Sequence, residues 1–167
     1  PEKMTLGRKL MLPSVMLEAR AICAGLRGLA RASSRESAPL IFEIVGGCLP
    51  PLVSMLEHYA PAQEPLLHLL KVFRDFGGAQ MPHLHGAHAL AFAQQAAALT
   101  RAYATHVPSE PADGIIDRAM TDEERFEHAL VLVQLLARLA AREEQGSDEF
   151  AAPYGAVLLD CMAGVLP

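Results

Sequence analysis

The sequence predicts an all-α protein in which amphipathic helices stack in antiparallel pairs. The composition is the first observation behind this fold class, because Ala and Leu dominate, aromatic residues make up only 5% and Trp is absent. Such a composition favours helices over sheets. The second observation is that apolar residues recur at helical spacing, in segments bounded by Pro, Gly and Ser. We therefore expect six helices in three pairs.

The first pair is expected at residues 14–32 and 38–59. Pro13 precedes the first helix and Ser33 follows it, and its apolar residues recur at intervals of seven, four and three. The second helix opens at Pro39. It contains Gly46-Gly47 and Pro50-Pro51, so we expect a kink or break near residue 49.

The second pair is expected at residues 62–76 and 86–107, where Gly77-Gly78 would end the first helix. A polar connector containing Pro follows. Thr121 and Glu124 form a predicted capping box for the fifth helix, which we expect to end near Glu144. A sixth helix begins near Pro153.

The spacing between successive pairs indicates a helical repeat. First helices start about 48 residues apart, at Ser14 and Ala62, and the second-helix segments about 46, at Ala38 and about Leu84. These spacings are close to the period of roughly 40–47 residues in HEAT and armadillo arrays. We therefore favour a HEAT-repeat α-solenoid over a closed six-helix bundle, although the bundle needs the same helices. The expected organisation is a lead-in (1–13), pair 1 (14–59), pair 2 (60–107), a connector (108–120) and a truncated pair 3 (121–167).

Charge and cysteine content exclude several classes of protein. A net charge of −5 argues against a nucleic-acid surface. Three cysteines without a CxxC spacing are expected to be reduced and buried, as in a cytosolic or nuclear protein. Apolar runs such as residues 40–45 are too short to span a membrane. Pro1 in place of an initiator Met indicates a piece of a longer chain.

No constellation in the sequence predicts catalysis or cofactor binding, so we do not expect an enzyme. His83, His85 and His88 lie close together, but no Cys or carboxylate in the nearby sequence completes a metal site, and we expect them to be solvated. Cys48 has no adjacent base that would make it a nucleophile.

Polar stripes on the second helices are the candidate binding surface. Equivalent helices of a solenoid line one wall, so their polar faces combine into one surface. We expect Glu43, Glu57 and Arg101 to face a protein cargo there, with the two acids favouring a basic one.

Several segments in a fixed order resemble nuclear transport receptors of the importin-β (karyopherin) superfamily, and in particular exportin-4-like members. Leu26-Arg27-Gly28-Leu29-Ala30 resembles the end of a repeat's first helix, and Glu64-Pro65-Leu66-Leu67 resembles the start of the next one. Exportin-7-like receptors are similar at the first two segments along the chain, residues 26–33 and 38–43. The other matching segments are residues 38–43, 56–59, 99–103, 121–126, 135–139 and 154–159.

The resemblance implies a receptor that binds protein cargo together with RanGTP and carries it through the nuclear pore. Its cargoes would include the hypusine-bearing translation factor, and it would contact nuclear pore proteins and shuttle between nucleus and cytoplasm. RanGTP would bind mainly outside this segment. The alternative is a HEAT- or armadillo-type scaffold without Ran dependence. Neither reading involves cofactors, nucleic acid or a membrane.

Overall fold

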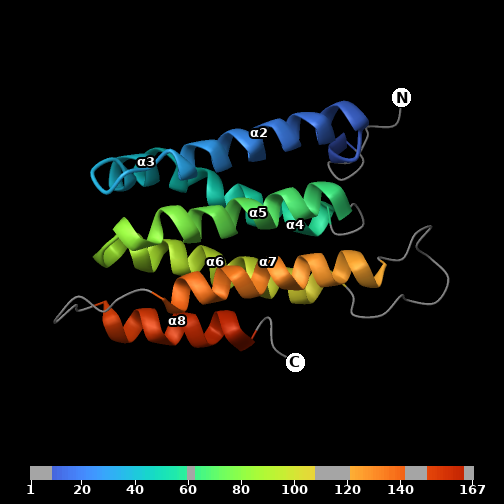
Figure 1. The fold of residues 1–167 in the computed structure, drawn as a ribbon. Helices are drawn as coiled ribbons and strands as arrows, with labels where there is room; N and C mark the ends of the chain where they lie inside the picture. Colours follow the sequence, from blue (N-terminus) through green and yellow to red (C-terminus); the bar gives the residue numbers. More distant parts are fainter. Residues whose placement is uncertain (1–8, 60–62, 108–120, 142–149, 164–167) are drawn as a thin grey trace.

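A computed structural model describes residues 9–59, 63–107, 121–141 and 150–163, and within them it contains helices and no strand (Figure 1). The all-α prediction is therefore confirmed for this part of the chain. The α-helices are α2 (Pro13–Arg31), α3 (Ala38–Val45), α4 (Leu49–Tyr59), α5 (Gln63–Ala79), α6 (Gly86–His106), α7 (Asp122–Ala140) and α8 (Ala151–Ala163), and the 3₁₀ turns are η1 (Gly46–Cys48) and η2 (Met81–His83).

The predicted break in the second helix is present. Helices α3 and α4 together occupy the expected segment, and η1 separates them. Pro50 and Pro51 lie in the first turn of α4. Neither residue has a backbone N–H, and each ring would clash with the carbonyl four residues earlier, so one regular helix cannot run through this point.

The capping box of α7 is also confirmed. The Glu124 amide donates a hydrogen bond to Thr121 Oγ1 at 3.2 Å, and the Thr121 amide donates one to Glu124 Oε2 at 2.8 Å. Asp122, Glu123 and Glu124 occupy the first turn, where acidic side chains interact favourably with the helix dipole.

The prediction that Gly77-Gly78 ends the third helix is wrong, because α5 continues to Ala79. These glycines allow close packing instead. A Cβ atom at Gly77 would lie 3.0 Å from Leu135 Cδ1 and 3.5 Å from Arg138 Cβ, both on α7. A side chain at Gly77 would therefore push the two helices apart.

Two other predicted boundaries differ or fall outside the description. Helix α7 ends at Ala140 with Ala141 as its C-cap, earlier than the expected end near Glu144. The connector at 108–120, the lead-in up to residue 8 and the end of the chain after residue 163 lie outside the described residues.

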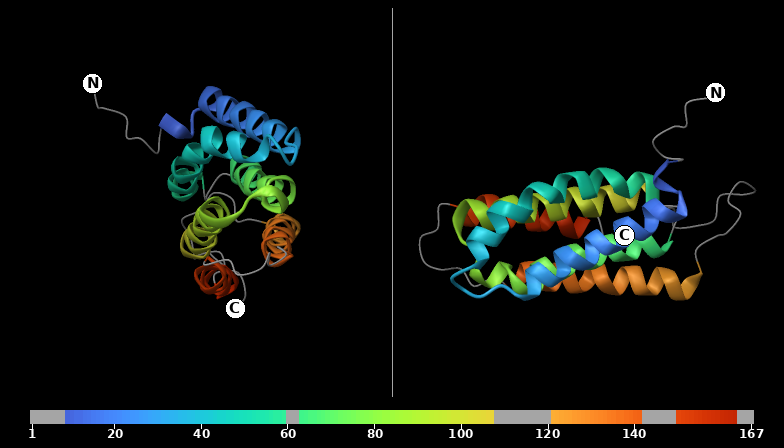
Figure 2. Two further views of the ribbon diagram at one scale, coloured as in Figure 1. Left: turned by 90° about the vertical axis from the view of Figure 1, so that its left-hand side faces the viewer. Right: turned by 90° about the horizontal axis from the view of Figure 1, so that it is seen from above.

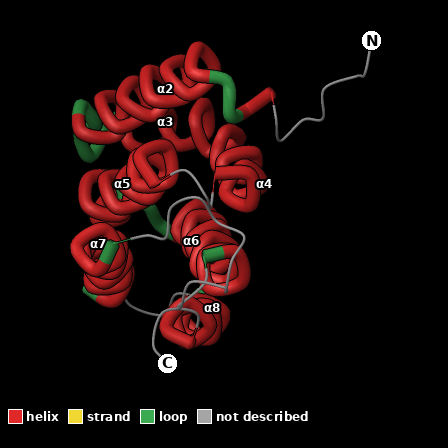
Figure 3. The backbone as a smooth tube through the Cα atoms, turned by 90° about the vertical axis from the view of Figure 1, so that its right-hand side faces the viewer, coloured by secondary structure: helices red, strands yellow, loops and turns green. Residues whose placement is uncertain are grey.

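The helices form two layers (Figures 2 and 3). One layer contains α2, α5 and α7, which stack in that order, and the other contains α3 with α4, then α6, then α8. In Figure 1 the helices of the first layer run one way and those of the second layer run back. Apart from α3 and α4, which follow each other within one layer, successive helices are therefore antiparallel. The second helices of pairs 1 and 2, which we expected to line one wall, lie side by side as α4 and α6.

The core lies between the layers and centres on Phe92 of α6. Its ring centroid is 6.3 Å from that of Phe42 in α3, and 6.2 and 6.3 Å from those of Phe73 and Phe76 in α5. Phe73, Phe76 and Phe92 are fully buried. Large rings thus fill the space between layers, whereas small residues such as Ala93 allow the helices within a layer to approach closely.

Both ends of the stack expose large apolar side chains. At the α2–α3 end these include Leu17, Ile22 and Ile44, and at the α7–α8 end they include Phe126 and Leu159. The segment Ala38–Tyr59, at 22 residues, is long and apolar enough to cross a membrane by length and composition alone. This differs from the expectation that no stretch is long enough to span a membrane. Length and composition alone do not identify a membrane helix, because the core helix of a soluble protein passes the same test.

The three cysteines are free, but only two are buried. Burial raises the pKa of the Cys23 and Cys161 thiols to about 11, which keeps them protonated and unreactive. Cys48 is exposed, so the expectation that it is buried is wrong. It lies in η1, where the break in the second helix interrupts the regular inward-facing stripe.

Candidate protein-binding surfaces

The three residues expected to face cargo lie in the same layer. Glu43 belongs to α3, Glu57 to α4 and Arg101 to α6, and each side chain is at least half exposed. Arg101 forms an ion pair with Asp160 of α8. It therefore lies one helix farther along the stack than the two glutamates.

Each glutamate lies beside a histidine of α6. The Glu43 Oε1 atom is 3.8 Å from His88 Nε2, and Glu57 Oε2 is 3.9 Å from His106 Nε2. A histidine offsets a carboxylate only when it is protonated, and the described residues provide no Lys or Arg partner for either glutamate. These positions therefore contribute negative charge to the surface.

A hollow of about 240 Å³ lies next to Glu43, between the α3–α4 break and α6. The ring of Phe42 lies in its wall, and Gly46, Pro50 and Gln94 line it as well. The break that the prolines impose thus creates a depression with apolar walls beside an acidic residue.

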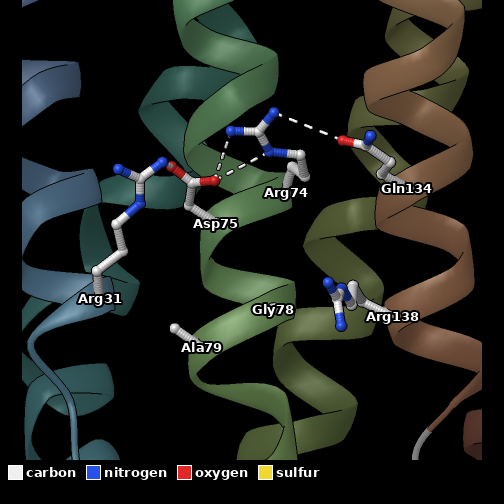
Figure 4. Close-up of a pocket in the computed structure, with 7 residues that line it drawn as sticks. All are labelled: Arg31, Arg74, Asp75, Gly78, Ala79, Gln134 and Arg138. Atoms are coloured by element: carbon white, nitrogen blue, oxygen red, sulfur yellow. Dashed lines mark hydrogen bonds and ion pairs between the residues drawn. The ribbon is translucent and has the colours of Figure 1, made fainter.

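The opposite layer carries a second hollow, of about 420 Å³, which we call the arginine groove (Figure 4). Arg31 extends into it from α2, Arg74 and Asp75 from α5, and Gln134 and Arg138 from α7. Gly78 and Ala79 also line it, and their small size leaves the space open.

Asp75 organises the charges of this groove. Its side chain is only 7% exposed. Its Oδ2 atom accepts a hydrogen bond from Arg27 Nε at 2.7 Å and lies 2.7 Å from Arg31 Nη2 in an ion pair. Arg74 donates from Nε at 2.9 Å and from Nη2 at 2.7 Å. The carboxylate therefore holds three guanidinium groups from two helices.

The pKa of Asp75 is below its usual value as a result. Burial acts to raise it, but hydrogen bonds from Arg27 and Arg74, together with the attraction of their positive charges, outweigh burial. The carboxylate is therefore ionised at neutral pH.

Positive charge remains in excess in the groove. Arg74 Nη1 lies 3.5 Å from Gln134 Oε1, a weak contact, and Arg138 has no charged partner among the described residues. The neighbouring Lys71 is already paired with Glu127 at 2.8 Å. The groove lining thus contains one carboxylate and three arginines, in a chain whose net charge is −5. The same carboxylate also pairs with Arg27, which lies outside the lining.

Sequence reasoning missed this groove. In the sequence, Asp75, Gln134 and Arg138 each have the pattern of a solvated helix face, which is where such residues usually lie. The spacing of four between Arg27 and Arg31, and again between Gln134 and Arg138, does place each pair on one helix face. Nothing local, however, indicates that the faces of three helices meet around Asp75.

The histidines near residue 85 separate in the structure. His83 lies in η2, His85 is the N-cap of α6, and the His88 ring packs against Phe42 with centroids 5.6 Å apart. Among the described residues, no group of three or more His, Cys, Asp or Glu side chains gathers as metal ligands would.

The sequence matches no model of a known protein family, and no curated protein is significantly similar to it.

Proposed function

We propose that this chain is a protein-binding segment of a HEAT-type α-solenoid. On the sequence resemblance, we further propose that the solenoid is a nuclear transport receptor similar to exportin 4. Such a receptor binds cargo together with RanGTP in the nucleus, contacts nuclear pore proteins and shuttles to the cytoplasm. The chain itself would have no enzymatic activity.

The observation that carries the proposal is that the first helices of successive pairs pack on one another, and so do the second helices. In a solenoid each repeat contacts only its neighbours, so first helices form one layer and second helices the other. The sequence of contacts α2–α5–α7 and α4–α6–α8 follows this rule. A closed bundle would instead bring the first and last helices together around one core, whereas α2 and α8 lie at opposite ends of the stack (Figure 1).

An ion pair joins each two successive helices of the first layer. Arg20 of α2 pairs with Glu64 of α5, and Lys71 of α5 pairs with Glu127 of α7. Exposed ion pairs contribute little stability, about 0.2–1 kcal/mol each. They add polar contacts to the stacking of each helix on the next.

The exposed apolar ends also support a repeat architecture. An end repeat presents the faces on which another repeat would stack, and these faces are apolar unless a capping repeat covers them. The helices at the two ends of the stack do expose large apolar side chains, among them Leu17 and Ile22 of α2, Phe126 of α7 and Leu159 of α8.

The proposed cargo face is the outer side of the second-helix layer. Glu43 and Glu57 lie there without a Lys or Arg partner among the described residues, beside the hollow that Phe42 and Gln94 line. An acidic surface with an apolar depression suits a basic protein, because complementary charge guides association and sets specificity.

Charge reversal at Glu43 and Glu57 tests the surface. In the full-length protein, Glu43→Lys combined with Glu57→Lys should weaken binding of the hypusine-bearing translation factor, measured by calorimetry with GTP-loaded Ran. The matched control is Glu18→Lys with Glu36→Lys, which changes the net charge equally at exposed acids elsewhere. Equal affinities for the two double variants would refute the assignment of this face.

Ran dependence tests the transport function separately. Cargo and Ran that favour one receptor conformation raise each other's affinity by the same factor. We therefore expect the cargo to bind more tightly with GTP-loaded Ran than with GDP-loaded Ran. If the nucleotide makes no difference, the transport function fails, and a Ran-independent HEAT or armadillo scaffold is the function that fits.

A further inference from the structure

The arginine groove has the features of a site for an anionic partner. It lies in the layer opposite the proposed cargo face, and three helices contribute to it, so its geometry is fixed by the stack rather than by a loop (Figure 4). Its volume of about 420 Å³ is large enough to admit several side chains of a bound segment.

The guanidinium groups are held in place before any partner arrives. Arg27, Arg31 and Arg74 are all held by Asp75. Its carboxylate accepts three hydrogen bonds of 2.7–2.9 Å from Arg27 and Arg74, and it forms an ion pair with Arg31 Nη2 at 2.7 Å. A guanidinium group has five N–H donors, so most donors of the three groups stay available. Arginines already fixed in this way lose less conformational entropy when they bind a carboxylate.

Arg138 adds a charge that nothing in the described part of the chain neutralises. Its side chain lies beside Gly78, where a Cβ atom would be in ordinary van der Waals contact with Arg138 Nε, at 3.7 Å. Arg31 and Arg138 approach the groove from opposite sides, α2 and α7, with Arg74 between them.

We propose that this groove binds an acidic segment of a protein partner, with its Asp or Glu carboxylates accepting hydrogen bonds from Arg31, Arg74 and Arg138. Bidentate arginine–carboxylate pairs are among the stronger polar contacts in proteins. A nucleic acid fits less well, because its phosphates need an extended basic surface and the chain carries a net charge of −5. The inference does not depend on the proposed transport function.

The binding test uses a short fluorescein-labelled polyglutamate peptide and the full chain. Fluorescence anisotropy should show saturable binding that weakens as NaCl is raised, and a polyglutamine peptide of equal length should not bind. Arg138→Gln should weaken polyglutamate binding about tenfold, as expected for the loss of one charge-assisted contact. Arg31→Gln should also weaken it, and it provides a second variant if the first is poorly folded.

The matched control is Arg35→Gln, which removes an exposed arginine between α2 and α3, outside the groove lining, and should leave peptide affinity unchanged. The proposal is overturned if polyglutamate does not bind, or if Arg35→Gln weakens its binding as much as Arg138→Gln does. It is also overturned if a polyuridine oligonucleotide binds more tightly than the peptide and Arg138→Gln abolishes that binding, because the groove would then be a nucleic-acid site.

Discussion

Asp75 shows how one buried carboxylate can organise a surface. It is only 7% exposed, yet it stays ionised because Arg27, Arg31 and Arg74 surround it. Removing such a carboxylate leaves guanidinium groups partly buried and without a counter-charge, which is unfavourable. The residue therefore stabilises the α2–α5 contact as well as shaping the arginine groove.

Asp75→Asn should lower the free energy of unfolding at pH 7 by about 1.5–3 kcal/mol, the contribution of hydrogen bonds to charged groups. The pKa of Asp75 is lower in the folded chain, so the unfolded chain takes up the proton first as the pH falls. The stabilisation is therefore present above the unfolded pKa of about 3.9 and is lost as the pH falls toward the folded value.

Urea unfolding of the wild type and Asp75→Asn at pH 7 and at pH 3 measures this. The difference in free energy between the two proteins should shrink at the lower pH. A difference that stays constant over this range would mean that the carboxylate charge contributes nothing to the effect.

Residue-level reasoning from sequence succeeded where the chemistry is local. Thr121 and Glu124 are three residues apart, and their capping box depends on nothing else in the chain. Asp75 carries no comparable signal, because its partners Arg27 and Arg31 precede it by more than forty residues. Its role follows only from the packing of α2 against α5.

Gly77 and Gly78 are the reason that the predicted end of α5, at residue 76, is too early. Gly77 interrupts no hydrogen bond of α5; its missing side chain makes room for Leu135 of α7. The N-termini of helices were easier to predict than this, since Pro13, Pro39 and Thr121 act through their own backbone or side chain. A glycine in a helical segment can end the helix or allow a neighbouring helix to pack closely. Which of the two applies depends on the neighbouring helix.

Replacing glycine by alanine at two positions should distinguish a glycine that has no neighbour from one that allows close packing. Gly28 is exposed in α2, and a Cβ atom there would meet nothing within 4 Å, so Gly28→Ala should stabilise the protein by about 0.5–1 kcal/mol. Gly77→Ala gains the same helix propensity, but its Cβ would lie 3.0 Å from the buried Leu135. We expect no gain there, or a loss.

Thermal unfolding followed by circular dichroism compares the two variants directly. The melting temperature should rise for Gly28→Ala and should not rise for Gly77→Ala. An equal rise in both would show that α5 and α7 have room between them and that the close packing at Gly77 has no energetic consequence.

At the scale of the whole molecule, stability should vary along the stack. Helices α5 and α6 have a neighbour on both sides within their layer, whereas α2 and α8 have a neighbour on one side only. In a repeat stack, stability is a sum of terms from each repeat and its neighbours, so the ends open before the middle.

Native-state hydrogen exchange tests this proposal for the architecture. Amides of α5 and α6 should exchange most slowly, and those of α2 and α8 should exchange faster, as measured by mass spectrometry of proteolytic fragments. Uniform protection of all the helices would favour a closed bundle that unfolds as one unit.

The layered arrangement itself could be predicted from the repeat spacing, but the chemistry of its two faces could not. The repeat spacing predicts that 38–59 and 86–107 are equivalent helices, and α4 and α6 do pack side by side. Periodicity within a helix identifies only which residues share one of its faces. Whether a face meets another helix depends on long-range packing. Arg31, Arg74 and Arg138, which are far apart in the sequence, therefore meet in one groove that no single helix predicts.

The position of the first and last helices has a consequence for engineering. The chain enters the stack at α2 and leaves it at α8, at the opposite end (Figure 1). Along the first layer, two interhelical spacings of about 8–10 Å each separate α2 from α7. A circular permutant would need a linker long enough to cross the whole stack, whereas a tandem fusion would connect α8, at the end of one stack, to α2, at the start of the next.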